Sequence, residues 1–537
     1  MIRQRMIDNA LGRASGVADP HLMLAFDQAT VPSWLGDRLA DSPPAGVSLF
    51  REWNIVSPDQ TAELTTELQR ANASSMPLLI AADQEGGQLV ALTGSTPFAG
   101  NMAIGATGDT DLAYRVGVAT GRELLSVGIN TNYAPAVDVA TQPENPSLGV
   151  RSFGDDADAV ARFAGSMASG LIDGGVLASS KHFPGKGEAL VDPHYDMPVL
   201  NLDRDRLEAV ELLPFRSAIE AGTQILMVGH YAVPAITSHD DLPISVSQEG
   251  IDGLARQEMG FEGVIITDAL DMGALDQGPT QVVEIIAMMR AGIDLLLCMP
   301  DPALQERVRS AVERGFSRGL IPEAALAASR KRISDLRSAI KEPVIDPTLV
   351  GNAEHVALAS ELATRATTLI RDKHGVLPLI TGTELSIFCI EPTPANLTPA
   401  DTTELYPPTM AKAFRSFHPA VMELVYPHSP SKQDIAGLIS QARQHDAVVV
   451  GTVFAGESQA DLVNALLQTD LLVITVALRT PFDLAMYPHA DIHICTYSSH
   501  EPSMRALASA VFGETAFQGR LPAAIPALYP TGHGMVP

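Results

Sequence analysis

The segment GKGEALVDPHYDMP, residues 185–198, carries an aspartate and a histidine two positions apart. Its glycines and prolines interrupt any regular helix or strand, so we expect a loop here. A carboxylate beside an imidazole can fix the tautomer of the ring and raise its basicity. Asp192 and His194 could therefore act as an acid–base pair, although an isolated Asp-x-His more often only stabilises a turn.

Other polar residues come directly after apolar runs. Asp83 ends PLLIAAD, Lys181 and His182 end GVLASSKH, His230 ends QILMVGH, and Asp268 lies in GVIITDAL. Each has an ordinary structural explanation, such as a helix cap at Asp268 or a core histidine at His182. The functional interpretation depends on all of them meeting at one face, with His230 supporting the site.

A pocket that holds a buried carboxylate and a separate proton donor suits the cleavage of a glycosidic bond. One carboxylate attacks the anomeric carbon, and an acid protonates the leaving oxygen. Histidine can be that acid because imidazoles titrate near neutral pH. In this hypothesis Asp268 is the nucleophile, and Asp192 with His194 is the acid–base pair.

The elements that must position these residues alternate regularly over residues 1–340. Helix-like segments such as 57–73, 109–128 and 156–175 separate most of the apolar runs. The apolar runs lie at 23–26, 46–50, 77–83, 129–135, 175–184, 224–230, 263–270 and 293–299. Buried strands that alternate with amphipathic helices predict an α/β fold, a (β/α)₈ barrel whose function lies at the carboxyl ends of its strands. An open doubly wound sheet is the alternative that periodicity leaves open.

A second unit follows the barrel. Residues 322–340 are expected to form a helix, and 341–351, with two prolines and a glycine, to form a linker. Further apolar runs lie at 384–390, 421–426, 446–454, 471–478 and 491–497. We therefore expect a catalytic barrel over 1–340 and a smaller α/β sandwich domain over 352–537. The second domain is expected to have a structural role, with His500 and Glu501 near the barrel.

The composition excludes several classes of protein. The 537 residues include 36 Lys and Arg against 63 Asp and Glu, a net charge of −27 that argues against a nucleic-acid or anionic-membrane surface. No apolar run is long enough to span a bilayer, and MIRQRMIDNALGRASG lacks the apolar core of a signal peptide. We expect a cytoplasmic protein. The three cysteines, Cys298, Cys389 and Cys495, are expected to be buried free thiols.

Several segments resemble glycoside hydrolase family three, and in particular its bacterial β-N-acetylglucosaminidases. KHFPGKGEALVDPH resembles the signature KHFPGHG followed by D-S-H, and EMGFEGVIITDALDMGAL resembles the nucleophile segment. AADQEGG, NYAPAVDV, NPSLGVRSFG, AGIDLLLCMP and GRLPAAIP are similar to further family blocks, so the likeness covers nearly the whole chain. In this family Asp-x-His is specific to the N-acetylhexosaminidase branch. The β-glucosidase branch generally takes its acid–base carboxylate from elsewhere, often from the second domain.

The resemblance implies a retaining mechanism with a covalent glycosyl-enzyme. Asp268 would be the nucleophile, His194 the acid–base residue and Asp192 its partner. Four residues would bind hydroxyls of the terminal sugar: Asp83, Arg151, Lys181 and His182. The implied substrate is a small glycoside with a terminal β-linked N-acetylglucosamine (GlcNAc), for example a cell-wall fragment in recycling. Neither a metal nor an organic cofactor is implied.

The chain also departs from the family pattern. Lys186 replaces the usual His of PGHG, and Pro193 replaces Ser inside the Asp-x-His element. Gln88 and Ala91 stand where arginines are expected, so one cation that contacts the sugar is missing or is supplied elsewhere. Three alternatives therefore stay open: a β-glucosidase or β-xylosidase, a phosphorylase that resolves the glycosyl-enzyme with phosphate, and a non-catalytic sugar-binding homologue.

Overall fold

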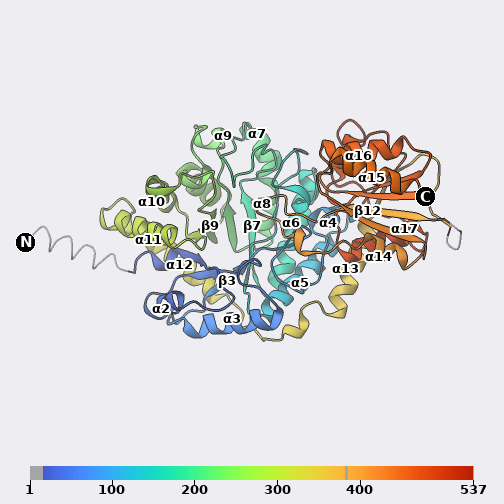
Figure 1. Ribbon diagram of the computed structural model, residues 1–537. Coiled ribbons are helices and arrows are strands. Elements are labelled where there is room, and N and C mark those ends of the chain that lie inside the picture. Colours follow the sequence, from blue (N-terminus) through green and yellow to red (C-terminus); the bar gives the residue numbers. More distant parts are fainter. Residues whose placement is uncertain (1–15, 381–384, 536–537) are drawn as a thin grey trace, which may run out of the picture.

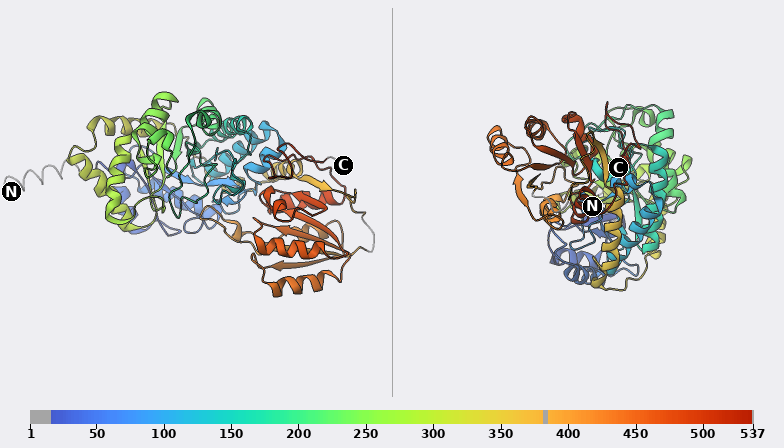
Figure 2. Two further views of the ribbon diagram at one scale, coloured as in Figure 1. Left: turned by 90° about the horizontal axis from the view of Figure 1, so that it is seen from above. Right: turned by 90° about the vertical axis from the view of Figure 1, so that its right-hand side faces the viewer.

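The computed structural model describes residues 16–380 and 385–535. The chain forms a large α/β unit followed by a smaller one, which lies at one end of it (Figure 1, orange and red). Figure 2 shows the same arrangement from above, with the smaller unit projecting beside the larger one. No helix of the described residues is long and apolar enough to cross a membrane.

The larger unit is a closed barrel of parallel strands in the order β1-β10-β9-β8-β7-β6-β3-β2. The predicted (β/α)₈ barrel is therefore confirmed, and the open sheet is excluded. All eight apolar runs contribute a strand. The barrel strands are β1 (Leu22–Ala25), β2 (Gly46–Ser48), β3 (Leu79–Ala82), β6 (Thr131–Asn132), β7 (Leu177–Phe183), β8 (Ile225–Val228), β9 (Val264–Ala269) and β10 (Leu295–Cys298).

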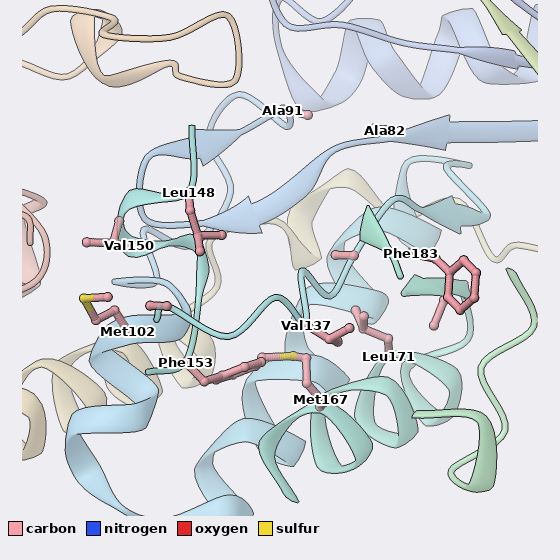
Figure 3. Close-up of a cluster of buried hydrophobic side chains, with 14 of the residues drawn as sticks. Ala82, Ala91, Met102, Val137, Leu148, Val150, Phe153, Met167, Leu171 and Phe183 are labelled. Atoms are coloured by element: carbon pink, nitrogen blue, oxygen red, sulfur yellow. The ribbon is translucent and has the colours of Figure 1, made fainter. Parts of the chain in front are cut away.

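Helices surround the barrel. Three of them, α3, α5 and α6, correspond to the helices predicted at 57–73, 109–128 and 156–175. The α-helices of this unit are α2 (Ser33–Asp41), α3 (Pro58–Ala71), α4 (Asn101–Thr107), α5 (Thr110–Ser126), α6 (Ala157–Gly174), α7 (Arg204–Arg206), α8 (Leu213–Glu220), α9 (Pro234–Thr237), α10 (Gln281–Ala291), α11 (Pro302–Ser317) and α12 (Glu323–Ser338). A π-helix, Glu249–Glu258, lies between β8 and β9. Their apolar faces and the outer faces of the strands form one continuous core. Figure 3 shows part of it, with Met167 and Leu171 of α6 below Val137.

Inside the barrel, the alternation of side chains along each strand places the polar residues at the carboxyl ends of the strands. Successive side chains of a strand alternate between its two faces. In β9, Val264 and Ile266 belong to the inner hydrophobic cluster, and Asp268 continues this inward series where the strand ends. In β3, Ala81 belongs to the same cluster and Asp83 is next in the series. The carboxylates therefore reach the mouth of the barrel because the two-residue period carries them there.

The smaller unit contains a six-stranded sheet in the order β11-β16-β15-β14-β12-β13. Five of its strands were predicted. The sixth, β11, was not among the predicted runs, and it pairs antiparallel with β16 at the edge of the sheet. The strands are β11 (Thr368–Asp372), β12 (Ile387–Pro392), β13 (Val421–Tyr426), β14 (Ala447–Thr452), β15 (Leu472–Ala477) and β16 (Ile492–Cys495). The helices are α13 (Ala353–Ala366), α14 (Met410–Arg415), α15 (Lys432–Ala442), α16 (Glu457–Leu467) and α17 (Glu501–Val511).

Between the two units, α12 ends at Ser338 and α13 begins at Ala353. We propose the division of the chain that composition indicated, with a barrel domain over 1–340, a linker over 341–351 and a C-terminal domain over 352–537. The three cysteines are buried free thiols, as predicted.

Candidate active site

A pocket of about 270 Å³ lies at the carboxyl ends of the barrel strands. Six of the seven predicted site residues line it: Asp83, Arg151, Lys181, His182, His194 and Asp268. The seventh, Asp192, is buried behind His194 and hydrogen-bonded to it. The barrel therefore brings together residues that are up to 185 positions apart in the sequence (268 − 83).

A buried ion-pair cluster forms one wall of the pocket. Lys181 Nζ lies 2.5 Å from Asp83 Oδ1 and 2.6 Å from Glu85 Oε1. Arg151 donates two hydrogen bonds of 2.8 Å to the two carboxylate oxygens of Glu85. Glu85 was not predicted as a site residue, although its position two residues after Asp83 in AADQEGG was an available signal.

The opposite charges of this cluster keep Glu85 and Lys181 ionised. Burial would raise the pKa of Glu85, but Arg151 and Lys181 hold it well below its usual range. Burial would lower the pKa of Lys181, but the carboxylates of Asp83 and Glu85 keep it above its ordinary value. The cations therefore stay charged in a dehydrated site, where charged donors bind sugar oxygens strongly.

His182 is held as a neutral imidazole. Burial, together with the charges of Lys186 and Arg151, lowers its pKa well below the ordinary value. Its Nδ1 lies 2.8 Å from Asp138 Oδ2, and its Nε2 lies 3.2 Å from Arg151 Nη2. These partners imply that Nδ1–H donates to Asp138 and that Nε2 accepts from Arg151. Asp138 was also missed as a site residue, although its segment NYAPAVDV had been noted.

Asp268 is the ionised carboxylate at the end of β9. Burial would raise its pKa, but the side chains that face the carboxylate, including the buried Lys186 ammonium, outweigh burial and bring the pKa to about 2. The Ala269 N–H donates to Oδ1 at 2.9 Å. His230 lies behind the site, with Nε2 3.2 Å from the Asp268 carbonyl oxygen. At neutral pH this carboxylate is available as a nucleophile.

Asp192 and His194 form the pair that their spacing predicted. His194 Nδ1 lies 2.6 Å from Asp192 Oδ1, which also accepts the His194 backbone N–H at 3.0 Å. Burial would raise the pKa of Asp192, but the hydrogen bond from His194 outweighs it and keeps this pKa low. About a quarter of the His194 side chain is exposed, against 4% for Asp192. With Nδ1 bound to the carboxylate, Nε2 is the nitrogen available to a substrate.

Lys186, one of the residues that depart from the family pattern, is a buried cation. Its side chain is 1% exposed, and its ammonium makes no ion pair with a carboxylate of the described residues. Burial and the neighbouring Arg151 lower its pKa to about 8, against 10.5 in the unfolded chain. Lys186 therefore destabilises the folded protein below pH 8, and this penalty fades as the pH rises from 8 to 10.5.

Replacing Lys186 by methionine is expected to raise the free energy of unfolding at pH 7 by about 1–3 kcal/mol, because a buried charge becomes an apolar group of similar volume. Denaturant unfolding at pH 7 and pH 10 measures this gain, which should shrink at the higher pH. Lys331→Met is the matched control, since the Lys331 side chain is 76% exposed and only weakly paired with Asp335. A Lys186→Met protein less stable than its parent at pH 7 would contradict the prediction.

The second domain also reaches the pocket, a contact that was not predicted from the sequence. Residues 399–402 line it opposite the barrel. They are held to the hairpin β4 (Gln84–Gly86) and β5 (Leu89–Val90), where Thr402 N–H donates to the Gln88 carbonyl at 2.8 Å. Asp401 is a carboxylate of this segment, but a buried ion pair of 2.7 Å with Arg479 occupies it. It therefore lacks the freedom expected of a proton donor.

Two further contacts connect the domains. Arg51 Nη1 donates to the Tyr406 hydroxyl at 2.8 Å, and His500 Nε2 lies 2.8 Å from the Gly87 carbonyl oxygen. His500 thus meets the barrel, as the sequence suggested. Gln88, which stands where an arginine was expected, donates to the Ala400 carbonyl at 3.2 Å. It joins the domains and does not replace the missing cation.

A (β/α)₈ barrel with clustered carboxylates and cations at its strand ends defines a barrel enzyme that acts on a small polar substrate. Residues 34–336 match the model of the glycosyl hydrolase family 3 N terminal domain. The chain belongs to this family and is a glycoside hydrolase.

Three relatives illustrate the similarity. Beta-hexosaminidase A of Pseudoalteromonas piscicida is 29% identical over 564 residues, 92% of this chain and 92% of that protein. A beta-N-acetylglucosaminidase/beta-glucosidase of Cellulomonas fimi is 30% identical over 363 residues, 65% of this chain and 63% of that protein. The structure of a glycoside hydrolase family 3 β-N-acetylglucosaminidase from Paenibacillus sp. str. FPU-7 has a TM-score of 0.90 at 31% identity, covering 95% of this chain and 98% of that one. The predicted family resemblance is thus confirmed.

Proposed function

We propose that this protein is a retaining, exo-acting β-N-acetylglucosaminidase that removes terminal GlcNAc from small glycosides. One observation carries the proposal: His194, bound through Nδ1 to Asp192 at 2.6 Å, lines the same pocket as the ionised Asp268. The names of the hexosaminidase relatives support the sugar. The only second-domain carboxylate that lines the pocket within the described residues, Asp401, is sequestered by Arg479, which favours His194 as the proton donor.

The proposed reaction has two steps. In the first, the Asp268 carboxylate attacks the anomeric carbon while the glycosidic C–O bond breaks, and His194 Nε2 gives its proton to the leaving oxygen. In the second, His194 takes a proton from water, the water oxygen bonds to the anomeric carbon, and the bond to Asp268 breaks. Two inversions at one carbon give net retention. Asp192 stabilises the imidazolium and holds the ring in place.

The terminal sugar would bind against the ion-pair cluster. Asp83 accepts hydrogen bonds from sugar hydroxyls, and Arg151 and Lys181 donate to them. His182 differs from this scheme, because its two ring nitrogens already bond to Asp138 and Arg151. We propose that His182 orients Arg151 at least as much as it contacts the sugar.

The test is the release of p-nitrophenol from the β-N-acetylglucosaminide and from the β-glucoside, each with and without phosphate. A strong preference for the N-acetyl sugar, independent of phosphate, is the expected result. Turnover stimulated by phosphate would make the enzyme a phosphorylase. No turnover of either glycoside would favour the sugar-binding homologue.

A β-glucosidase activity is the second candidate. The Cellulomonas fimi relative is named for both activities. Ala91 lines the pocket where the family pattern has an arginine, so one expected contact to the sugar is absent. Comparable kcat/KM values for the two nitrophenyl glycosides would establish the dual specificity.

Replacing His194 by alanine is expected to lower kcat/KM for N,N′-diacetylchitobiose by about 10²–10⁴-fold, because a poor leaving group needs the proton. The loss should be much smaller for a dinitrophenyl glycoside, which leaves as a stable anion.

Asp271→Asn is the matched control for this series. Asp271 lines the same pocket, and its loss of hydration there raises its pKa, so it is the rival proton donor. Equal losses for good and poor leaving groups in His194→Ala, with a selective loss in Asp271→Asn, would transfer the acid role to Asp271.

A further inference from the structure

The loop that carries the Asp192–His194 pair is anchored at both ends. At its start, Asn145 Nδ2 donates to the Lys186 carbonyl at 2.8 Å. At its end, the Leu200 N–H donates to the Ala232 carbonyl at 2.8 Å. Between these anchors, residues 190–197 form no helix or strand. The position of the pair therefore depends on what holds this middle part.

Two hydrogen bonds hold the middle of the loop to the rest of the protein. The Gly273 N–H donates to the His194 carbonyl at 3.0 Å, and the Ala274 N–H donates to the Pro193 carbonyl at 3.1 Å. Within the described residues, no other hydrogen bond or ion pair connects residues 190–197 to residues outside the loop. The carbonyl of the acid–base residue itself is thus one of the two contact points.

The donors come from the segment that leaves β9. Gly273 follows Asp268 by five positions. One short segment therefore carries both the Asp268 carboxylate and the two N–H groups that hold the loop, a contact that we call the clamp. Side-chain hydrogen bonds from two glutamines hold this segment in place. Gln277 Nε2 donates to the Met272 carbonyl at 3.0 Å, and Gln281 Nε2 donates to the Leu270 carbonyl at 2.5 Å.

Only glycine allows this close approach. A Cβ at position 273 would lie 2.5 Å from the Tyr195 carbonyl oxygen and 3.0 Å from the His194 carbonyl oxygen, both backbone atoms. The φ angle of Gly273 lies outside the left-handed region, so alanine could adopt its backbone conformation. Because hydrogen bonds from Gln277 and Gln281 hold the segment of Gly273, we expect a methyl group at this position to displace the loop.

We propose that Gly273 is a positioning residue for catalysis: with Ala274 it clamps the loop and sets where His194 stands relative to Asp268. This inference rests on the proposed function, because it concerns proton donation by His194. The segment after β9 carries the nucleophile and also holds the loop. It therefore fixes the distance between Asp268 and His194, which the exposed loop could not fix alone.

Gly273→Ala is expected to lower kcat/KM about 10–100-fold for N,N′-diacetylchitobiose, because a misplacement of about 1 Å costs this much when a proton must be delivered. For the dinitrophenyl glycoside, the loss should stay below about 3-fold, since that leaving group needs little protonation. In a His194→Ala background, Gly273→Ala should add less than about 3-fold for the disaccharide, as expected of two residues that act through one group.

Gly36→Ala is the matched control, since no atom lies within 4 Å of a Cβ at that position in α2. It should leave all three measurements unchanged. Equal losses of Gly273→Ala on both substrates, or additive effects with His194→Ala, would overturn the proposal in favour of a general structural role. Ala274→Pro, which removes the second donor, should repeat the selective loss.

Hydrogen exchange tests the clamp without any substrate. Mass spectrometry should show faster exchange in Gly273→Ala than in the parent for the peptide that carries the two clamp N–H groups, residues 270–276, and for the loop peptide covering 189–198, with the rest of the barrel unchanged. Unchanged exchange would overturn the clamp. If the clamp is seen but the parent hydrolyses neither glycoside, the proposed function fails and, with it, the catalytic role of Gly273.

Discussion

Asp268→Ala is expected to reduce kcat for p-nitrophenyl β-N-acetylglucosaminide by about 10⁴-fold or more, because the covalent intermediate cannot form. The carboxylate is ionised at any pH of interest, since its neighbours bring its pKa to about 2.

A small external nucleophile makes the result diagnostic. The deleted carboxylate leaves space on the face opposite the leaving group, so azide should partly restore turnover and give the α-glycosyl azide. Ligand-induced thermal shifts should show that the variant still binds the sugar. Full activity of Asp268→Ala, or a β-configured azide product, would exclude Asp268 as the nucleophile.

Glu85→Gln is expected to destabilise the protein by about 3–5 kcal/mol, because two buried cations lose their shared counter-ion. The Glu85 and Arg151 side chains are each only 2% exposed. Chemical denaturation at pH 7 measures the loss. We also expect a marked fall in kcat/KM, since Arg151 and Lys181 would no longer be held for the sugar.

The difference in stability between the parent protein and Glu85→Gln depends on pH through the pKa of Glu85. Its value in the folded protein lies below the ordinary 4.5. Glu85 therefore contributes its full stabilisation above about pH 4.5 and loses it as the pH falls through its folded value. The gap between parent and Glu85→Gln should narrow in acid.

Glu361→Gln provides the matched control for this substitution. Glu361 also pairs with an arginine through two oxygens, but its side chain is 36% exposed and that of Arg115 is 41% exposed. Loss of such a pair should cost about 1 kcal/mol or less. A similar loss of stability in both variants would show that burial does not strengthen the ion pairs of Glu85.

The sequence by itself predicted the barrel, with an open sheet as the remaining alternative, and most of the residues that line its pocket. Alternating apolar runs and amphipathic segments predict parallel strands with crossover helices, and the two-residue period places Asp83 and Asp268 at strand ends. The Asp192–His194 contact was also predictable, because two residues separated by one proline in a short loop cannot lie far apart.

Only the tertiary structure decided which residues meet. Glu85 pairs with Arg151 across 66 positions, Lys181 with Asp83 across 98, and Val90 meets Thr402 of the second domain across 312. The clamp of Gly273 on His194 likewise depends on the segment after β9 and the loop after β7 lying side by side. Periodicity reports the face of an element that a residue occupies. It carries no information on which other element that face will contact, because barrel closure and domain docking set those distances.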